Sequence, residues 1–213
     1  MKKVLEVGGF IAGAILVVFG VAAVVLAING NSTVNSSLKA EKITGSPDMT
    51  PALIKQEVAG QAWAKGYNFP TSSVANKAVD NGSQARVFAQ YMRIHALEAT
   101  GGLTYSQMGR YATADGAAIG TNDATKAVQK NGQPVSNSAR DIWVTETALT
   151  TALNVSFLAT QISLFSVVVG VALILAGVGF IVLDWAALHR RKQTTIVIPD
   201  TPPLEQPKEP ALV

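Results

Sequence analysis

The stretch SARDIWVTETALTTALNVSFLATQISLFSVVVGVALILAGVGFIVLDWAALHRR, residues 138–191, decides the fold of this chain. It contains no proline and its first glycine is Gly170, so it predicts one continuous helix that begins at Ser138. A helix of this length would extend about 80 Å, whereas the hydrocarbon core of a bilayer is about 30 Å thick. Residues 161–185 carry a single charge, on Asp184, and we predict that they cross the membrane. The N-terminal part of the helix is then expected to join a soluble domain.

A second apolar segment, residues 7–28, lies near the N-terminus behind Lys2 and Lys3. It has the length of about 20 residues that a helix needs to cross a bilayer. A cleaved signal peptide has a similar pattern, but its apolar region is about 7 to 15 residues long and precedes a cleavage site of small residues, which is missing around Ile28. A first membrane span is therefore favoured over a signal peptide. The expected organisation is an N-terminus at 1–6, spans at 7–28 and 161–185, an extracytoplasmic linker and helical domain at 29–160, and a basic, proline-rich tail at 186–213.

Positive charges at the ends of the two segments predict the orientation. Lys2 and Lys3 flank the first span, and the run 190–192 (Arg-Arg-Lys) follows the second. Because positive residues near membrane spans stay on the cytoplasmic side, we expect both termini in the cytoplasm and the central domain outside the plasma membrane. The tail from residue 193 contains five prolines and is expected to be extended. It either binds a cytoplasmic partner or has no role of its own.

Composition excludes several classes of function. The chain is 48% hydrophobic and 15% charged, which is too apolar for an ordinary soluble domain unless the excess lies in a few runs. The net charge of +3 is not gathered in a basic block, so nucleic acid is not an expected partner. The chain has no cysteine, which excludes disulfides and thiolate metal sites.

Between the two spans the pattern predicts an all-α domain, because no sustained alternation of apolar and polar residues occurs. Residues 29–44, rich in Ser, Asn and Lys, are expected to form a linker that leaves the membrane. Thr50 and Pro51 have the order of a helix cap and a first helical residue. The expected helices run from Thr50 to Gly66, from Gln84 to Thr100, from Thr104, which opens a capping box with Gln107, to about Ala112, and from Thr121 or Asn122 to Asn131.

Small residues recur at helical spacing in both apolar segments. Such residues let two helix backbones approach closely, and in a membrane this favours packing. We expect the two spans of one chain to pack against each other through them, with self-association of two chains as the alternative. The predicted helix-packing residues are Gly9, Gly13, Gly20, Ser163, Gly170 and Gly177.

Candidate chemistry is limited to one polar cluster on the helix at 84–100, formed by Tyr91, Arg93, His95 and Glu98. His95 and Glu98 are three residues apart, which places an imidazole and a carboxylate on one helix face, as metal sites require. However, His95 is the only histidine between the spans, and no HExxH, G-x-S-x-G or phosphate-binding glycine motif occurs. The expectation is a histidine bonded to Glu98 or a tyrosine, with no catalytic, cofactor or metal site.

Three runs carry a resemblance to a known group of proteins. They are ITGSPDMTP at 43–51, ARVFAQYMRIHALE at 85–98 and WVTETALTTALN at 143–154. The chain resembles uncharacterised actinobacterial two-span membrane proteins, some of which carry the automatic label of aromatic ring-opening dioxygenase. That chemistry needs several metal ligands, and the residues here argue against the label. The resemblance implies a two-span topology and a setting in the cell envelope but no activity.

These observations lead to one expected function and one alternative. The expected function is that of a non-enzymatic integral membrane protein of the bacterial cell envelope. Its helical domain would have a structural or protein-interaction role, with the lipid bilayer and a protein partner or a second copy of the chain as its partners. The alternative is an extracytoplasmic ligand-sensing or catalytic domain anchored by two spans.

Overall fold

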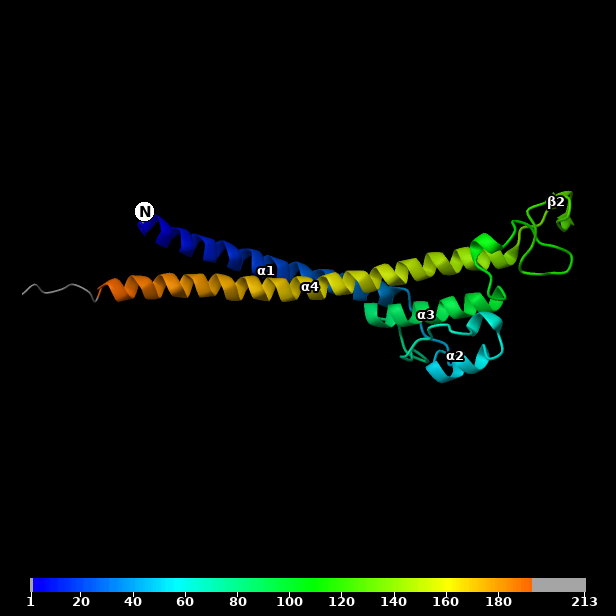
Figure 1. Ribbon diagram of the computed structural model, residues 1–213, viewed down its shortest axis with the longest axis horizontal. Helices are drawn as coiled ribbons and strands as arrows, with labels where there is room; N and C mark the ends of the chain where they lie inside the picture. The colour runs from blue at the N-terminus through cyan, green and yellow to red at the C-terminus, as the bar shows by residue number, and fades with distance from the viewer. Residues whose placement is uncertain (1, 193–213) are drawn as a thin grey trace, which may run out of the picture. The chain divides into compact units, whose positions relative to one another are not determined.

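The computed structural model describes the backbone of residues 2–192 and the side chains of residues 7–186. Within these limits the chain is mostly helical, and its two long apolar helices are α1 (Lys2–Ala40) and α4 (Ser138–Lys192) (Figure 1). The single helix predicted from Ser138 onward is confirmed. Between the long helices lie α2 (Pro51–Glu57), η1 (Ala62–Ala64), α3 (Gly82–Ala99), η2 (Tyr105–Gln107), β1 (Gln129–Lys130) and β2 (Gln133–Pro134).

The chain forms two compact units, each of which contains part of α1 and part of α4. Among the described residues, the terminal unit comprises residues 2–19 and 172–192, and the central unit comprises residues 20–171. In the terminal unit, a Cβ atom added to Gly13 would lie 2.7 Å from the carbonyl oxygen of Gly177, and one added to Gly177 would lie 2.5 Å from the carbonyl oxygen of Gly13. The two backbones therefore touch at this pair of glycines. Gly9 likewise faces the carboxyl group of Asp184.

In the central unit the same two helices meet at further small residues. A Cβ atom on Gly170 would lie 2.7 Å from the carbonyl oxygen of Gly20, and one on Gly30 would lie 3.5 Å from the hydroxyl oxygen of Ser163. The structure thus places all six predicted helix-packing residues where α1 and α4 of one chain contact each other.

Helix α1 is longer than the sequence pattern indicates, and the prediction of a linker at 29–44 is wrong as far as Ala40. The hydroxyl of Thr33 donates a hydrogen bond to the carbonyl of Asn29 inside the helix, which accommodates one of the polar side chains. Leu38 is buried at the end of α1, where it belongs to an apolar cluster of the central unit. Tertiary packing at the helix end therefore outweighs the weak helix propensity of Ser and Asn. The cluster joins Leu38 to Val79, Ala85, Ala89 and Leu153.

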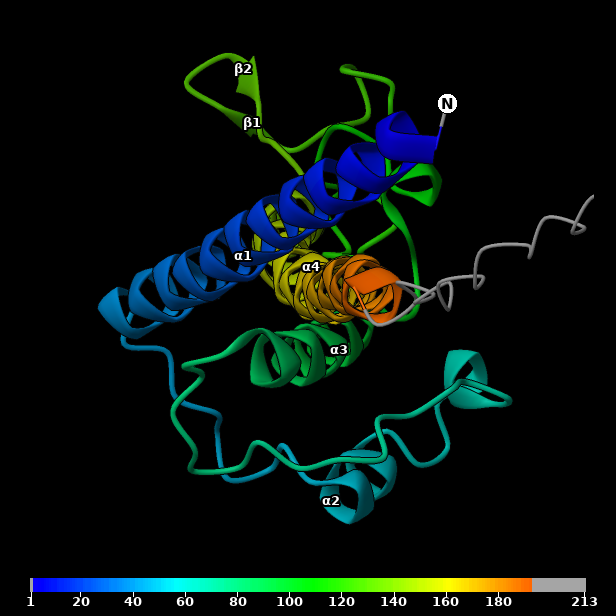
Figure 2. The ribbon, with the colours of Figure 1, turned by 90° about the vertical axis from the view of Figure 1, so that its left-hand side faces the viewer.

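Helix α3 runs antiparallel to the N-terminal half of α4, as Figures 1 and 2 show. Gly82, at its start, lies against Ser156 and Thr160, and the guanidinium of Arg86 donates to the side-chain oxygen of Asn154 at 2.7 Å. Helix α2 covers the opposite side of α3 (Figure 2). The main core lies between them and consists of the buried residues Met49, Ile54, Val58, Val74, Tyr91 and Ile94.

The predicted helix starts in this region are close to the observed ones. The hydroxyl of Thr50 accepts a hydrogen bond from the backbone N–H of Leu53, and Pro51 is the first residue of α2, as predicted. This helix ends at Glu57 and not near Gly66. Helix α3 is capped by the side chain of Asn81, which accepts from the N–H of Gln84 at 3.0 Å.

The segment between α3 and α4 differs most from the prediction. The capping box at Thr104 and Gln107 exists, but it opens a single 3₁₀ turn and not a helix to Ala112. The helix predicted at about 122–131 is wrong, because β1 and β2 pair there as an antiparallel hairpin. Asn131 and Gly132 form its turn with φ angles of 54° and 74°, the left-handed values that a tight hairpin requires. Between α3 and α4 the chain therefore forms turns, isolated β-bridges and a small β-hairpin, and no α-helix.

Candidate functional site

The four residues of the predicted polar cluster all lie on α3, yet they do not converge. Tyr91 is completely buried in the main core, and its hydroxyl donates to the carbonyl of Ser72 at 2.9 Å. Burial raises the pKa of Tyr91, so this side chain remains neutral. Tyr91 is therefore a core residue. Arg93 points to α4, whereas His95 and Glu98 lie beside α2.

Arg93 forms an ion pair with Glu146 across the contact of α3 and α4. The guanidinium Nη1 lies 2.9 Å from Oε2 of Glu146, whose side chain is only 2% exposed. The same guanidinium stacks on the ring of Trp143, with 4.6 Å from its carbon to the ring centroid. Burial raises the pKa of Glu146 although Arg93 opposes this effect. The pair links α3 to α4, but burial imposes a free-energy cost on the charged form of the Glu146 carboxylate.

This cost predicts a pH dependence of the domain's stability. Because the folded-state pKa of Glu146 is raised above its ordinary value of 4.5, protonation of Glu146 stabilises the fold. That contribution is fully present below pH 4.5 and is lost as the pH rises through the raised pKa. We expect the difference in free energy of unfolding, Glu146→Gln minus wild type, to be largest at neutral pH. It should shrink toward pH 4.5, because wild type gains stability as Glu146 becomes protonated. Thermal unfolding of both proteins across this range measures it, and a constant difference would contradict the prediction.

The chemistry-bearing groups that do converge are Asp48, Glu57 and His95. Asp48 lies in the turn before α2, Glu57 is the last residue of α2, and His95 lies on α3. One potential ligand atom from each lies within 4.8 Å of the other two. Nε2 of His95 is 2.8 Å from Oδ2 of Asp48. Two carboxylates and one imidazole from three elements thus share a small region of the surface, and together they can hold a divalent cation.

Charges around this site are predominantly negative. Burial raises the pKa of Asp48, but hydrogen bonds from Ser46 and its own backbone, together with the nearby imidazole, leave it below its ordinary value. Burial and the neighbouring carboxylate of Glu98 raise the pKa of Glu57, with His95 acting against them. Glu98 therefore belongs to the same group as a third carboxylate. Mutual repulsion of these acids is what an added cation would relieve.

The sequence pattern found only part of this group. His95 and Glu98 are on the predicted helix, but the carboxylate that lies 2.8 Å from Nε2 of His95 belongs to Asp48 and not to Glu98. Asp48 and Glu57 lie far upstream of His95 in the sequence, so no local spacing links them to it. They come together because α2 packs on α3 through the main core. The order Pro47-Asp48 before a capped helix is the only local signal, and it indicates a turn.

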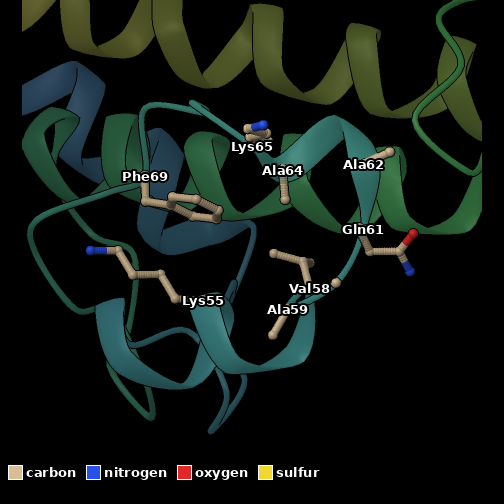
Figure 3. A pocket seen from close by; sticks show the side chains of 9 residues that line it. Lys55, Val58, Ala59, Gln61, Ala62, Ala64, Lys65 and Phe69 are labelled. Carbon is tan, nitrogen blue, oxygen red and sulfur yellow. The ribbon is translucent and has the colours of Figure 1, made fainter.

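Two open grooves border α3 and α2. One, of about 420 Å³, lies along α2 and η1 (Figure 3). Lys55 and Phe69 lie together at one side of this groove, with Nζ 5.8 Å from the ring centroid, and Val58 and Ala59 lie at the other. The second groove, of about 400 Å³, is lined by residues of α3 and α4 that include His95. Its walls are mainly apolar, with side chains such as those of Met92, Ala96, Ile142 and Leu149.

Comparison with protein-family models, with curated proteins and with solved structures gave no match. Of the polar groups described above, the converging acids and His95 offer metal coordination or proton transfer, whereas Tyr91 belongs to the main core and the Arg93–Glu146 pair to the contact of α3 with α4.

Proposed function

We propose that this chain is an integral membrane protein of the bacterial cell envelope that crosses the plasma membrane twice. Both termini would lie in the cytoplasm and the helical domain outside. The domain would have a structural or protein-interaction role. The resemblance noted above supports the bacterial setting, and the charge distribution at the ends of α1 and α4 supports the orientation.

The observation that carries the proposal is the apolar surface of α1 and α4. Large apolar side chains of both helices are mostly uncovered, such as Phe19 at 66%, Phe165 at 67% and Leu175 at 68% exposure. Leaving so much apolar surface in water is unfavourable at about 25 cal/mol per Å². A bilayer would cover it, and each helix satisfies its backbone hydrogen bonds internally, as hydrocarbon requires. Both helices are long and apolar enough to cross a membrane.

An interaction role is supported by apolar residues beyond the expected span. In the part of α4 that packs on α3, Val144 is 51% exposed and lies with Tyr105, Trp143 and Ala148 along a mainly apolar groove. Isolated exposed apolar residues are normal, but an apolar groove on a folded domain indicates a surface for a partner. A second protein or a second copy of the chain would cover this groove.

The topology can be tested with single cysteines, because the native chain has none. Ser106→Cys places a thiol on the exposed η2 turn, and Gln206→Cys places one in the C-terminal tail. A maleimide that does not cross membranes should label Ser106→Cys in intact cells and Gln206→Cys only after permeabilisation. The cysteine-free parent is the control for background labelling. The reverse pattern, or labelling of both in intact cells, would reject the proposed topology.

The interaction role requires a different experiment. Cross-linking in cells followed by purification in mild detergent should recover a homo-oligomer or a defined partner. Val144→Glu should reduce that recovery, whereas Lys130→Glu, at an exposed residue of β1, should not. A strictly monomeric protein that recovers no partner would count against the role.

The alternative function is an extracytoplasmic ligand-sensing or catalytic domain. The convergence of Asp48, Glu57 and His95 favours it, because interaction surfaces do not require such a group. A cellular phenotype lost in His95→Gln, with membrane insertion and partner recovery unchanged, would support this alternative over the structural role.

A further inference from the structure

We propose that Asp48, Glu57 and His95 bind a divalent first-row transition-metal ion, with Glu98 beside them as a neighbouring carboxylate. Such a site goes beyond the structural role proposed above and does not depend on it. The sequence alone argued against a metal because it shows a single histidine between the spans. The structure adds two carboxylates from other elements to that histidine.

The donor atoms lie close enough together to reach one ion after a small adjustment. Zinc binds histidine nitrogen and carboxylate oxygen at about 2.0–2.2 Å in a tetrahedral arrangement, so two of its ligands lie about 3.4 Å apart. Nε2 of His95 and Oδ2 of Asp48 are 2.8 Å apart, so an ion between them requires the two side chains to separate slightly. The widest separation in the group is no more than 4.8 Å, and Glu57 is exposed at the end of α2. The proposal requires the exposed side chain of Glu57 to move toward the other two ligands.

The imidazole nitrogen provides an independent observation. Nε2 of His95 is buried, and although Asp48 is close, the contact lacks the geometry of a hydrogen bond. A buried polar atom without a well-aligned hydrogen-bond partner is unfavourable. Coordination of an ion by Nε2 and the adjacent carboxylate would satisfy both atoms.

The charge balance points the same way. Within residues 7–186, no lysine or arginine forms an ion pair with Asp48, Glu57 or Glu98. The neighbours that act on Glu57 are the acids Glu98 and Asp48 and the imidazole. A bound dication would neutralise this excess of negative charge, whereas a purely structural histidine–aspartate contact leaves it in place.

The donor types select the class of metal. Calcium and magnesium prefer oxygen ligands, and magnesium keeps several of its waters. A set of one imidazole and two or three carboxylates, without thiolate, suits Zn²⁺, Mn²⁺ or Fe²⁺. Three protein donors leave further coordination positions for water. We therefore expect binding of Zn²⁺ and Co²⁺ and little competition from Mg²⁺.

The experiment measures Zn²⁺ binding to the full chain in detergent by competition with a chromophoric chelator. Wild type should bind Zn²⁺, and Glu57→Gln should bind it at least about tenfold more weakly. Tenfold is the lower end of the loss in metal affinity that follows replacement of an outer-shell partner. Glu41→Gln is the matched control, because Glu41 is an exposed carboxylate outside the group, and its affinity should equal that of wild type. His95→Gln should lose binding as Glu57→Gln does.

A second readout separates binding from folding. Circular dichroism should show the same helix content in Glu57→Gln and wild type, and Zn²⁺ should raise the Tm of wild type but not of Glu57→Gln. Co²⁺ should give visible absorption bands in wild type that are missing in Glu57→Gln. Equal Zn²⁺ affinity and equal Tm shifts in the two proteins would place the ion elsewhere on the chain and overturn the proposal, as would the lack of any Zn²⁺ binding to wild type.

Discussion

Replacing Arg93 with methionine is expected to reduce the free energy of unfolding of the central unit by about 3 kcal/mol. The substitution keeps much of the side-chain volume and the contact with α4 but removes the only ion-pair partner that Glu146 has among the described residues. The carboxylate of Glu146 is then left buried without a counter-charge, and breaking a buried pair costs about 3–5 kcal/mol. We expect the lower end because the side chain of Arg93 is 32% exposed, so water reaches the pair. Denaturant unfolding followed by tryptophan fluorescence measures the change, and Trp143 lies directly beside the substituted residue.

Two further variants test the cause of that loss. In the Arg93→Met background, Glu146→Gln removes the uncompensated charge and should recover a large part of the stability. Lys126→Met is the matched control, because the pair of Lys126 with Asp123 has 3.8 Å between nitrogen and oxygen and is exposed on both sides. An exposed pair of this kind contributes about 0–1 kcal/mol. Equal losses in Arg93→Met and Lys126→Met would show that burial of Glu146 does not govern the effect.

Replacing Gly177 with leucine is expected to separate α1 from α4 in the terminal unit, at a cost of about 3 kcal/mol. Even a single Cβ atom at Gly177 would lie 2.5 Å from the carbonyl oxygen of Gly13, and this neighbour is backbone and cannot turn aside. Helix association in a membrane depends on close packing of small residues, because lipid tails are as apolar as leucine. Gly179→Leu is the control, since nothing lies within 4 Å of a Cβ atom there.

A disulfide between residues 9 and 184 can report this separation. A Cβ atom on Gly9 would lie 3.0 Å from Cγ of Asp184. In a disulfide, with an S–S bond of about 2.05 Å, the Cβ atom of one cysteine lies about 3 Å from the sulfur of the other, so the two spacings agree. In the cysteine-free chain, Gly9→Cys with Asp184→Cys should therefore cross-link on oxidation. We expect Gly177→Leu to abolish the cross-link and Gly179→Leu to preserve it. Equal cross-linking in both would contradict the packing argument.

The long helices and their glycines could be predicted because the signals are local. An uninterrupted apolar run needs no tertiary information, and small residues at helical spacing mark a face. The hairpin could not be separated from a helix end, because Asn131-Gly132 suits both a helix C-terminus and a tight hairpin turn, each of which uses a left-handed residue. The extension of α1 to Ala40 was hidden because it is decided by the burial of Leu38 and not by propensity.

The candidate site shows the same division. Helical spacing identified His95 and Glu98 as a pair on one face, and the structure keeps both near the acidic group. Asp48 and Glu57 could not be foreseen, because their distance from His95 depends on how α2 docks onto α3. Buried contacts such as Ile54 and Ile94 set that docking, and they show in the sequence only as apolar positions.

Leu38 of α1 and Leu153 of α4 share one buried cluster with Val79, Ala85 and Ala89, so this second cluster is incomplete without the two long helices. A fragment cut at the ends of the two long apolar helices would expose the apolar side chains that these leucines cover, and it should be less stable and more prone to aggregate than the same residues in the intact chain. The order of synthesis matters too. The ribosome makes Leu38 early and Leu153 late, so the cluster closes only after the last long helix has begun to emerge.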